Sequence, residues 1–163
     1  MLTATNYALS GGEVAGNLGA GAAVVSGLVS LTGTTEATTL EISANGVLTL
    51  GASNRIGDAT VLSISGGELA LGTNSETVGA FTLSSGSLTG SGVLSAASYA
   101  LQSGNVAANL GVGTATVSGG VTMLRGTLGA LTVGVDSGSL VLGGSDRLAS
   151  GGTVTLGGGT LDM

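Results

Sequence analysis

The 163-residue chain contains no cysteine, histidine, proline, tryptophan or lysine, and its only basic side chains are Arg55, Arg125 and Arg147. Without histidine and cysteine, most zinc and haem sites and the nucleophile–histidine pairs of hydrolases are excluded. The missing cysteines fit both the cytosol and a secreted protein that uses no disulfides. The sequence therefore offers few of the residue types on which catalysis usually depends.

Positive charge is scarce, and nine acidic residues against three arginines give a net charge of −6. An anionic surface repels phosphate backbones, so we expect no nucleic-acid partner. The chain also lacks the basic clusters that anionic membranes attract. The charge-free run from Thr77 to Leu124 is broken throughout by Gly, Ser, Thr and Asn, unlike a membrane span. We therefore expect no membrane insertion by this segment.

Aromatic side chains are also rare, with one Phe and two Tyr, so an ordinary globular core would lack its bulky fillers. The chain has instead 33 glycines and 42% hydrophobic residues, chiefly Leu, Val, Ala and Ile. Disordered chains are poor in apolar residues and rich in charge, so this composition favours a folded protein. Small branched side chains suit a narrow core in which aliphatic residues stack on one another.

A long internal repeat organises the sequence. Leu2–Gly27 aligns without gaps with Leu94–Gly119, at an offset of 92 residues and with 16 of 26 positions identical. Gly46–Ile56 aligns with Gly138–Leu148 at the same offset. We interpret residues 1–163 as a single domain with an internal duplication, 2–93 and 94–163, of which the second copy is incomplete.

A shorter period lies inside the long one, marked by Gly, any residue, then Leu or Val. Five such units fill 92 residues, about 18 residues per unit, and the whole chain holds nine. The marking glycines are Gly12, Gly27, Gly46, Gly67, Gly86, Gly104, Gly119, Gly138 and Gly159.

Apolar residues two positions apart flank these glycines, and a period of two predicts β-strands with one buried face. The predicted inward pairs are Leu48 and Leu50, Leu62 and Ile64, Leu69 and Leu71, Phe81 and Leu83, Val121 and Met123, Leu140 and Leu142, and Val154 and Leu156. Threonine tolerates the exposed face of a strand, and we expect the following to face outward: Thr49, Thr82, Thr89, Thr122 and Thr155. No stretch predicts a helix.

A unit of about 18 residues is too short for a β-α-β crossover, which needs about 30 residues or more. It suits one coil of a parallel β-solenoid, because no single coil can bury its apolar face but stacked neighbours bury each other's. Each glycine would lie at a corner, where φ can be positive. Nine coils at about 4.8 Å each predict a rod of roughly 43 Å. One alternative is an antiparallel β-sandwich, but sandwich sequences do not usually repeat one Gly-marked element at every turn. The other is two tandem domains, but nothing between the two copies reads as a linker.

The segment Gly51–Gly111 carries a resemblance to a known family. Its GASNRIGDATVLSISGGELALGTNSETVGAFTLSSGSLTGSG, followed by SYALQSGNVAANLG, resembles the autotransporter-associated β-strand repeat of bacterial autotransporters and related surface proteins. The resemblance implies a right-handed parallel β-helix, a place outside the cell or on the bacterial surface, and a role as stalk or adhesin, with no catalytic residues. Two features of that family, an export signal and a C-terminal membrane barrel, are missing from this chain.

Chemical candidates are few. The carboxylates are Glu13, Glu36, Glu41, Glu68, Glu76, Asp58, Asp136, Asp146 and Asp162. The best local cluster is Arg55 with Asp58, and its counterpart in the second copy is Arg147 with Asp146. The cluster could be a carbohydrate or ion site or a solvated turn with a weak surface ion pair. Because Asp58 is replaced by Ser150 in the second copy, we favour the solvated turn. Four aspartates in nine units cannot build a ladder of calcium sites. The predicted threonines share no fixed position, as an ice-binding grid would require. We predict no catalytic, cofactor or metal residues and no enzymatic activity.

The two ends of the sequence bear on partners. Leu2 is already in repeat register and Met163 aligns with Leu71, in mid-unit, and neither end reads as a polar cap. We expect either continuation in a longer protein or end-to-end self-association into a filament. The sequence thus predicts a structural rod, stalk or filament. The alternative is an adhesin module that binds host or glycan ligands.

Overall fold

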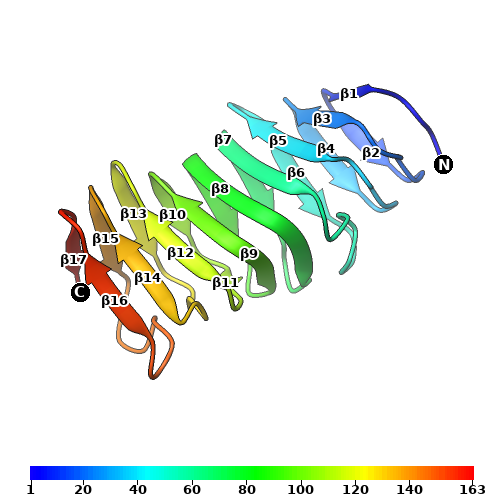
Figure 1. Ribbon diagram of the computed structural model, residues 1–163. Coiled ribbons are helices and arrows are strands. Elements are labelled where there is room, and N and C mark those ends of the chain that lie inside the picture. Colours follow the sequence, from blue (N-terminus) through cyan, green and yellow to red (C-terminus); the bar gives the residue numbers. More distant parts are fainter.

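The computed structural model describes residues 1–163 and consists of β-strands and turns, without a helix. Strand pairing is parallel throughout, and the chain winds into about nine coils of about 18 residues stacked along one axis (Figure 1). The parallel β-solenoid predicted from the Gly-marked period is therefore confirmed. The two termini lie at opposite ends of the stack.

Seventeen strands make up the coils. They are β1 (Asn6–Leu9), β2 (Gly12–Val14), β3 (Ala22–Val25), β4 (Leu28–Leu31), β5 (Thr39–Ser43), β6 (Val47–Leu50), β7 (Val61–Ala70), β8 (Glu76–Thr89), β9 (Val93–Leu101), β10 (Gly104–Val106), β11 (Asn109–Leu110), β12 (Thr114–Val117), β13 (Val121–Leu124), β14 (Thr132–Val135), β15 (Ser139–Leu142), β16 (Thr153–Leu156) and β17 (Thr160–Asp162).

The coils present three ladders, here named sides A, B and C. Side A stacks β1, β3, β5, β12, β14 and β16 with parts of β7, β8 and β9. Side B stacks β2, β4, β6, β10, β13, β15 and β17 with the ends of β7 and β8. Side C is the shortest, formed by β11, the starts of β8 and β9, and isolated bridges at Leu2, Leu18, Thr35, Ile56, Leu128 and Leu148.

Two columns of inward side chains run the whole length of side A. The first is Tyr7, Ala23, Leu40, Leu62, Phe81, Tyr99, Ala115, Val133 and Val154; the second is Leu9, Val25, Ile42, Ile64, Leu83, Leu101, Val117, Val135 and Leu156. Because successive side chains of a strand point to opposite faces, the residues between them face solvent. The inward columns of all three sides merge into one core of 36 buried residues.

The two tyrosines of the core are repeat partners and share two hydrogen bonds. The Tyr99 hydroxyl donates to the Leu94 carbonyl oxygen (3.1 Å) and accepts from the Ala96 N–H (2.9 Å). Tyr7 makes the matching pair of bonds in the first coil. Each phenol hydroxyl thus has hydrogen-bond partners inside the core, as buried tyrosines generally require. These hydrogen bonds also connect side C to side A.

The corner glycines have two physical roles, of which the sequence suggested one. Gly138 has the expected positive φ, 72°. Gly27 and Gly46 do not, and there the constraint is space. A Cβ on Gly27 would overlap the Ser10 carbonyl oxygen of the coil below, and one on Gly46 would overlap the Val25 carbonyl oxygen. The corner therefore needs glycine for close backbone stacking as well as for bending.

One stretch of the predicted strand pattern is wrong. The sequence predicts Val121 and Met123 inward and Thr122 outward, but Thr122 is fully buried and Val121 is 54% exposed. In the ladder, Thr122 takes the position that Val29 has in the first copy, an offset of 93 residues rather than 92. The extra residue lies in the corner before β13, which is one residue longer than the corner before β4. A one-residue shift turns every side chain of a strand to the other face. The remaining predicted threonines are not buried: Thr49, Thr82, Thr89 and Thr155.

Candidate functional site

The turn after β6 holds the Arg55 and Asp58 cluster that the sequence brought forward. The Arg55 guanidinium donates from Nε to the Ser53 carbonyl oxygen (3.1 Å) and from Nη1 to the Thr32 carbonyl oxygen (3.3 Å). Its bonds thus go to backbone carbonyls rather than to the Asp58 carboxylate. Arg55 fastens this turn to the preceding coil, which is a structural contact.

The matching turn in the second copy repeats the backbone but not the chemistry. Asn54 and Asp146, which are 92 residues apart, both lie in the left-handed region, at φ 56° and 58°. Short polar side chains tolerate that conformation. Beside Asp146, the Nε of Arg147 is buried without a hydrogen-bond partner. The two turns therefore share a conformation and no common set of functional groups.

Glu76, one carboxylate among nine in the sequence, is the most unusual ionisable group of the structure. It is 2% exposed and pairs in register with Leu94 on side C, where the other coils place leucine or isoleucine, except for Thr35. Its carboxylate accepts the Arg55 N–H at 2.7 Å and the Ile56 N–H at 3.1 Å. Glu76 thus provides from its side chain the acceptors that two buried N–H groups need.

Burial raises the pKa of the Glu76 carboxyl above its ordinary value. The two backbone hydrogen bonds and the positive charge of Arg55 lower this pKa, and the negative charge of Asp58 raises it further, so the net direction is upward. No second carboxylate shares the hydrogen bonds of Glu76, so the geometry is that of a buried structural acceptor.

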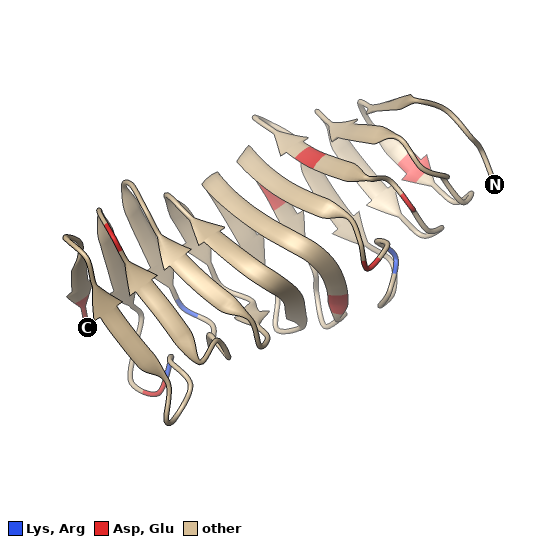
Figure 2. Ribbon diagram, in the orientation of Figure 1, with Lys and Arg blue, Asp and Glu red and all other residues tan.

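Three carboxylates on the outer surface follow a common pattern. Each accepts a hydroxyl from a neighbouring coil at 2.6 Å: Glu13 from Thr32, Glu41 from Ser65 and Glu68 from Thr89. The acidic residues are dispersed along the stack (Figure 2), and no group of three or more His, Cys, Asp or Glu side chains is placed to hold a metal ion. These carboxylates link coils to one another.

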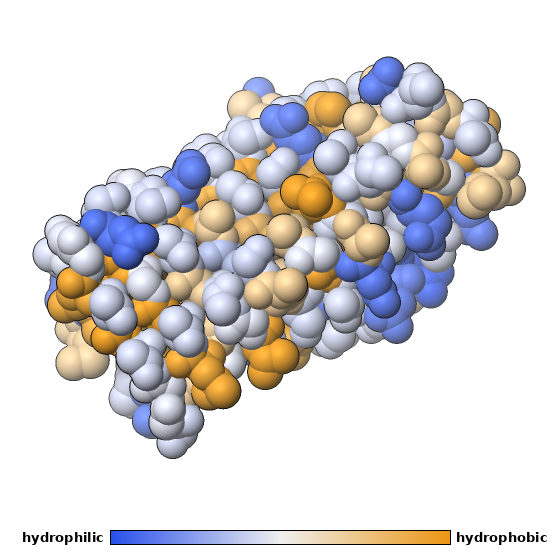
Figure 3. All heavy atoms as spheres, viewed as in Figure 1, coloured by the Kyte–Doolittle hydropathy of each residue, from blue (hydrophilic) through white to orange (hydrophobic).

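The outward surface of side A is nearly free of charge. Glu41 is its one ionisable residue, and small polar or apolar residues fill the other outward positions (Figure 3). Thr114, Thr132 and Thr153 do share one ladder position, but the neighbouring column has Gly134 between two threonines. The result is a flat, hydroxyl-bearing surface over the last three coils rather than a regular grid.

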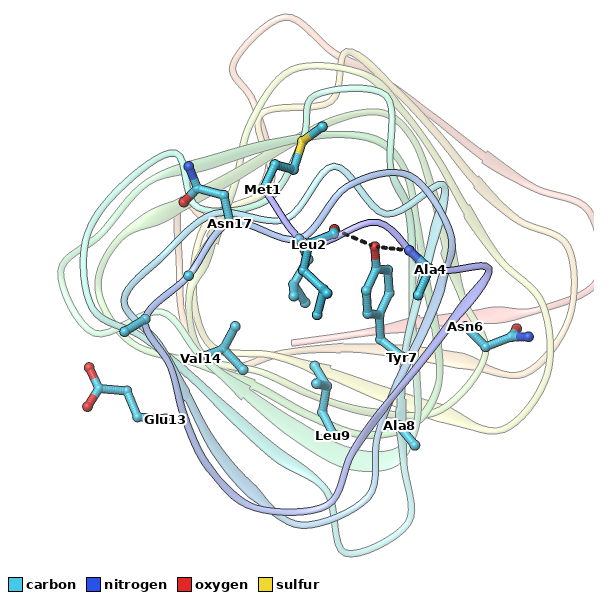
Figure 4. Close-up of a pocket in the computed structure, with 13 residues that line it drawn as sticks. Met1, Leu2, Ala4, Asn6, Tyr7, Ala8, Leu9, Glu13, Val14 and Asn17 are labelled. Atoms are coloured by element: carbon cyan, nitrogen blue, oxygen red, sulfur yellow. Dashed lines mark hydrogen bonds between the residues drawn. The ribbon is translucent and has the colours of Figure 1, made fainter.

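The amino-terminal end of the core opens into a hollow of about 590 Å³. Figure 4 looks into it along the axis, where Leu2, Tyr7, Leu9 and Val14 point inward from the three sides of the first coil. The hollow has one acid at its edge, Glu13, and no basic residue. It is the end of the inward columns, because β1 pairs only with β3 and β2 only with β4.

The carboxyl-terminal end has the same character. β16 pairs only with β14 and β17 only with β15. The inward residues of β16 are uncovered, so that Val154 is 37% and Leu156 57% exposed. Each end of the stack therefore presents unpaired strand edges around exposed core side chains, which is the usual template for adding another strand.

No family model, no curated protein and no solved structure matches the chain. Nor does the chain form a long apolar helix of the kind that crosses a membrane.

Proposed function

We propose that the chain is a structural β-solenoid segment that acts as a rigid rod or stalk in an extracellular or bacterial cell-surface protein. The observation that carries this proposal is the side A ladder, in which nine strands from β1 to β16 keep both inward columns in register from the first coil to the last. Most of the 103 backbone–backbone hydrogen bonds join one coil to the next. Bonds in that direction resist extension and bending of the rod.

The distribution of ionisable groups supports a structural role. The carboxylates with hydrogen bonds between coils, and Arg55, act on neighbouring coils rather than converge on a cleft. The place outside the cell rests on the resemblance of Gly51–Gly111 to the autotransporter-associated repeat. A structural spacer of that kind needs length and stiffness, and a stack of near-identical coils supplies both.

A second candidate is an adhesin module that binds host or glycan ligands. The flat hydroxyl-bearing surface around Thr114, Thr132 and Thr153 favours it, because hydroxyl groups both donate and accept hydrogen bonds to sugars. In that case binding, and not length, would be the selected property.

Length is the variable that separates the two. We would display the chain on a bacterial surface through an unrelated anchor, with a fluorescent tag at the far end, and compare it with a version that contains residues 2–93 twice. The five added coils lengthen the rod by about 24 Å, at about 4.8 Å per coil. A rod predicts that energy transfer from the tag to a membrane dye falls with the added block and is unaffected by alanine at Thr114, Thr132 and Thr153.

An adhesin predicts the opposite dependence. Binding of the purified chain to a glycan array would then disappear with those three alanine substitutions and would not depend on the added block. If the distance between the tag and the membrane did not increase with the added coils, the proposed function as a rod would be wrong.

A further inference from the structure

The ladder of side C is interrupted once along the stack. Its inward residues form two separate series of parallel bridges: Leu2, Leu18, Thr35 and Ile56 in the first four coils, and Glu76, Leu94, Leu110, Leu128 and Leu148 in the next five. No bridge joins Ile56 to Glu76, although the two residues lie on the same side in successive coils. We call this junction the side C seam.

A carboxylate takes the place of the missing bridge. At the preceding junction, which is bridged, the Thr35 N–H donates to the Arg55 carbonyl oxygen (2.8 Å) and the Gly57 N–H donates back to the Thr35 carbonyl oxygen (2.7 Å). At the seam, the N–H groups of Arg55 and Ile56 donate to Glu76, the first to Oε1 at 2.7 Å and the second to Oε2 at 3.1 Å. One ionisable side chain thus provides the acceptors that close the seam.

Sides A and B hold the two coils at the seam together by backbone pairing. Residues 61–64 pair with 80–83 on side A, and residues 68–70 pair with 87–89 on side B. The hydrogen bonds of a ladder run between backbone N–H and C=O groups, which do not titrate. A change of charge on side C therefore removes no hydrogen bond from either ladder.

The other contacts across the seam belong to the connection between β6 and β7. There the Asn54 N–H donates to the Ser75 carbonyl oxygen (3.1 Å), and the Ser75 N–H donates to the Ser53 Oγ (3.0 Å). This connection, residues 51–60, is longer than the equivalent connection 32–38 one coil earlier. Side C can therefore separate at the seam by a movement of the connection, while the strands of sides A and B remain paired.

Solvent lies close to the seam. A surface groove of about 400 Å³ runs over the corner between sides C and A, lined by Asp58 from the coil before the seam and by Thr77 and Val78 from the coil after it. Glu76 directly precedes Thr77 in the chain, yet it is itself only 2% exposed. A displacement of residues 51–60, which include Asp58, would bring the carboxylate into contact with the solvent in that groove.

Few charged groups surround Glu76. Arg55 lies across the seam with its guanidinium bonded to backbone carbonyl oxygens, and Asp58 is the other charged neighbour. The ladder partner in the next coil, Leu94, is apolar. Burial raises the pKa of the Glu76 carboxyl and outweighs the two N–H bonds and the charge of Arg55, which lower it. In an open seam the carboxyl is in water with an ordinary pKa, so loss of the proton favours opening.

We propose that the side C seam is a pH-sensitive opening built into the middle of the stack. Protonation of Glu76 keeps the seam closed, and ionisation of Glu76 shifts it towards a form that is open to solvent, while sides A and B remain paired. The inference goes beyond the proposed function, because it applies to a rod and to an adhesin module alike.

Amide exchange of single residues, followed by NMR from pH 4 to pH 7.5, tests the seam. Each rate is divided by the rate of the same residue in an unfolded chain at that pH, which leaves the protection due to structure. Protection of the Arg55 and Ile56 N–H groups should fall with rising pH, roughly tenfold for each unit by which the pKa of Glu76 exceeds its ordinary value. The Leu128 N–H, which donates to the Arg147 carbonyl oxygen at 2.7 Å on the bridged part of side C, should keep its protection.

Two variants assign the effect. In Glu76→Gln the acceptor no longer titrates, so the protection of the Ile56 N–H should be independent of pH. Asp58→Asn is the matched control, because it removes the neighbouring carboxylate and leaves Glu76 in place. It should keep the pH dependence and move its midpoint to lower pH, since the negative charge of Asp58 raises the pKa of Glu76.

Three results would overturn the inference. They are an Ile56 protection that is constant or rises with pH, a pH dependence that survives in Glu76→Gln, and a parallel loss of protection in residues 61–64 and 80–83, which would mean that the whole fold opens. If Glu76→Gln does not fold by circular dichroism, the comparison of Ile56 with residues 80–83 in the unmodified chain and the midpoint of Asp58→Asn decide. None of these results alters the distance between tag and membrane that tests the rod, so the two proposals fail independently.

Discussion

Thr122 is a polar residue in an aliphatic column. It is fully buried, and its hydroxyl oxygen has no hydrogen-bond partner, while the first copy has Val29 in the same position. Threonine and valine have nearly the same shape, so Thr122→Val removes a desolvated hydroxyl without opening a cavity. We expect stabilisation by about 1 kcal/mol, or roughly 2–4 °C in Tm for a chain of this size, measured by differential scanning calorimetry.

The matched control for this substitution is Thr49→Val, which is outward on β6 and removes no buried hydroxyl. It should change Tm by less than Thr122→Val. A lower Tm for Thr122→Val would mean that its hydroxyl is hydrogen-bonded in solution.

Glu76 makes the stability of the fold depend on pH. Its carboxyl has a raised pKa in the folded chain, whereas in the unfolded chain it titrates near the ordinary value of about 4.3. Between these two values the folded state holds more protons, so the free energy of unfolding falls as pH rises through this window. Above the folded pKa the penalty for burying the charge is complete and constant.

Glu76→Gln isolates this dependence, because glutamine does not titrate while the other acids remain. The difference in unfolding free energy, original chain minus variant, should be largest below pH 4 and should decrease as pH rises through the window. Chemical denaturation from pH 3.5 to 7.5 measures it. A difference that is flat with pH, or that increases, would contradict a buried carboxyl with a raised pKa.

Thr122 and Glu76 also mark what the sequence could not predict. The apolar period of two predicts that Val121 and Met123 face inward. The extra residue in the corner before β13 turns both side chains to the outer face. The inward position of Glu76 could have been predicted, because Glu76 lies one 18-residue unit before Leu94. That prediction would have required knowing that side C has its own inward column. This column consists largely of single bridged residues, so it produces no alternation of apolar and polar residues in the sequence.

Strands were the readily predicted elements. The inward pairs Leu62 and Ile64, and Phe81 and Leu83, are fully or almost fully buried, because each is repeated in neighbouring coils at the same place in the unit. The corners were harder. Their glycines were expected for positive φ, yet Gly27 and Gly46 are required by contact with the coil below, which no local pattern records.

That contact predicts which glycines accept a side chain. In Gly46→Ala the new Cβ would overlap the Val25 carbonyl oxygen and approach the Ser43 carbonyl oxygen at 3.0 Å, both on backbone that cannot rotate away. We expect a loss of about 1–3 kcal/mol in unfolding free energy. Urea denaturation followed by circular dichroism measures it.

Gly16→Ala is the control, since a Cβ there meets nothing within 4 Å and φ is not positive. It should be neutral or stabilise by up to about 1 kcal/mol, because alanine restricts the unfolded chain. Equal losses for the two variants would show that glycine matters here for a reason other than space between coils.

The fold as a whole has contacts only between successive coils, and its stability should follow position along the axis. The strands with the most partners are β7, β8 and β9, in the middle of the stack, while β1 and β16 each have one neighbour. In such an array local opening proceeds from the ends inward, since an end coil loses one interface and a middle coil two.

Amide hydrogen exchange should therefore show a gradient, with slow exchange in residues 61–70 and 76–89 and fast exchange in residues 6–9 and 153–156. Uniform protection along the stack would show instead that the coils open as one cooperative unit, and the end coils would then be no less stable than the middle ones.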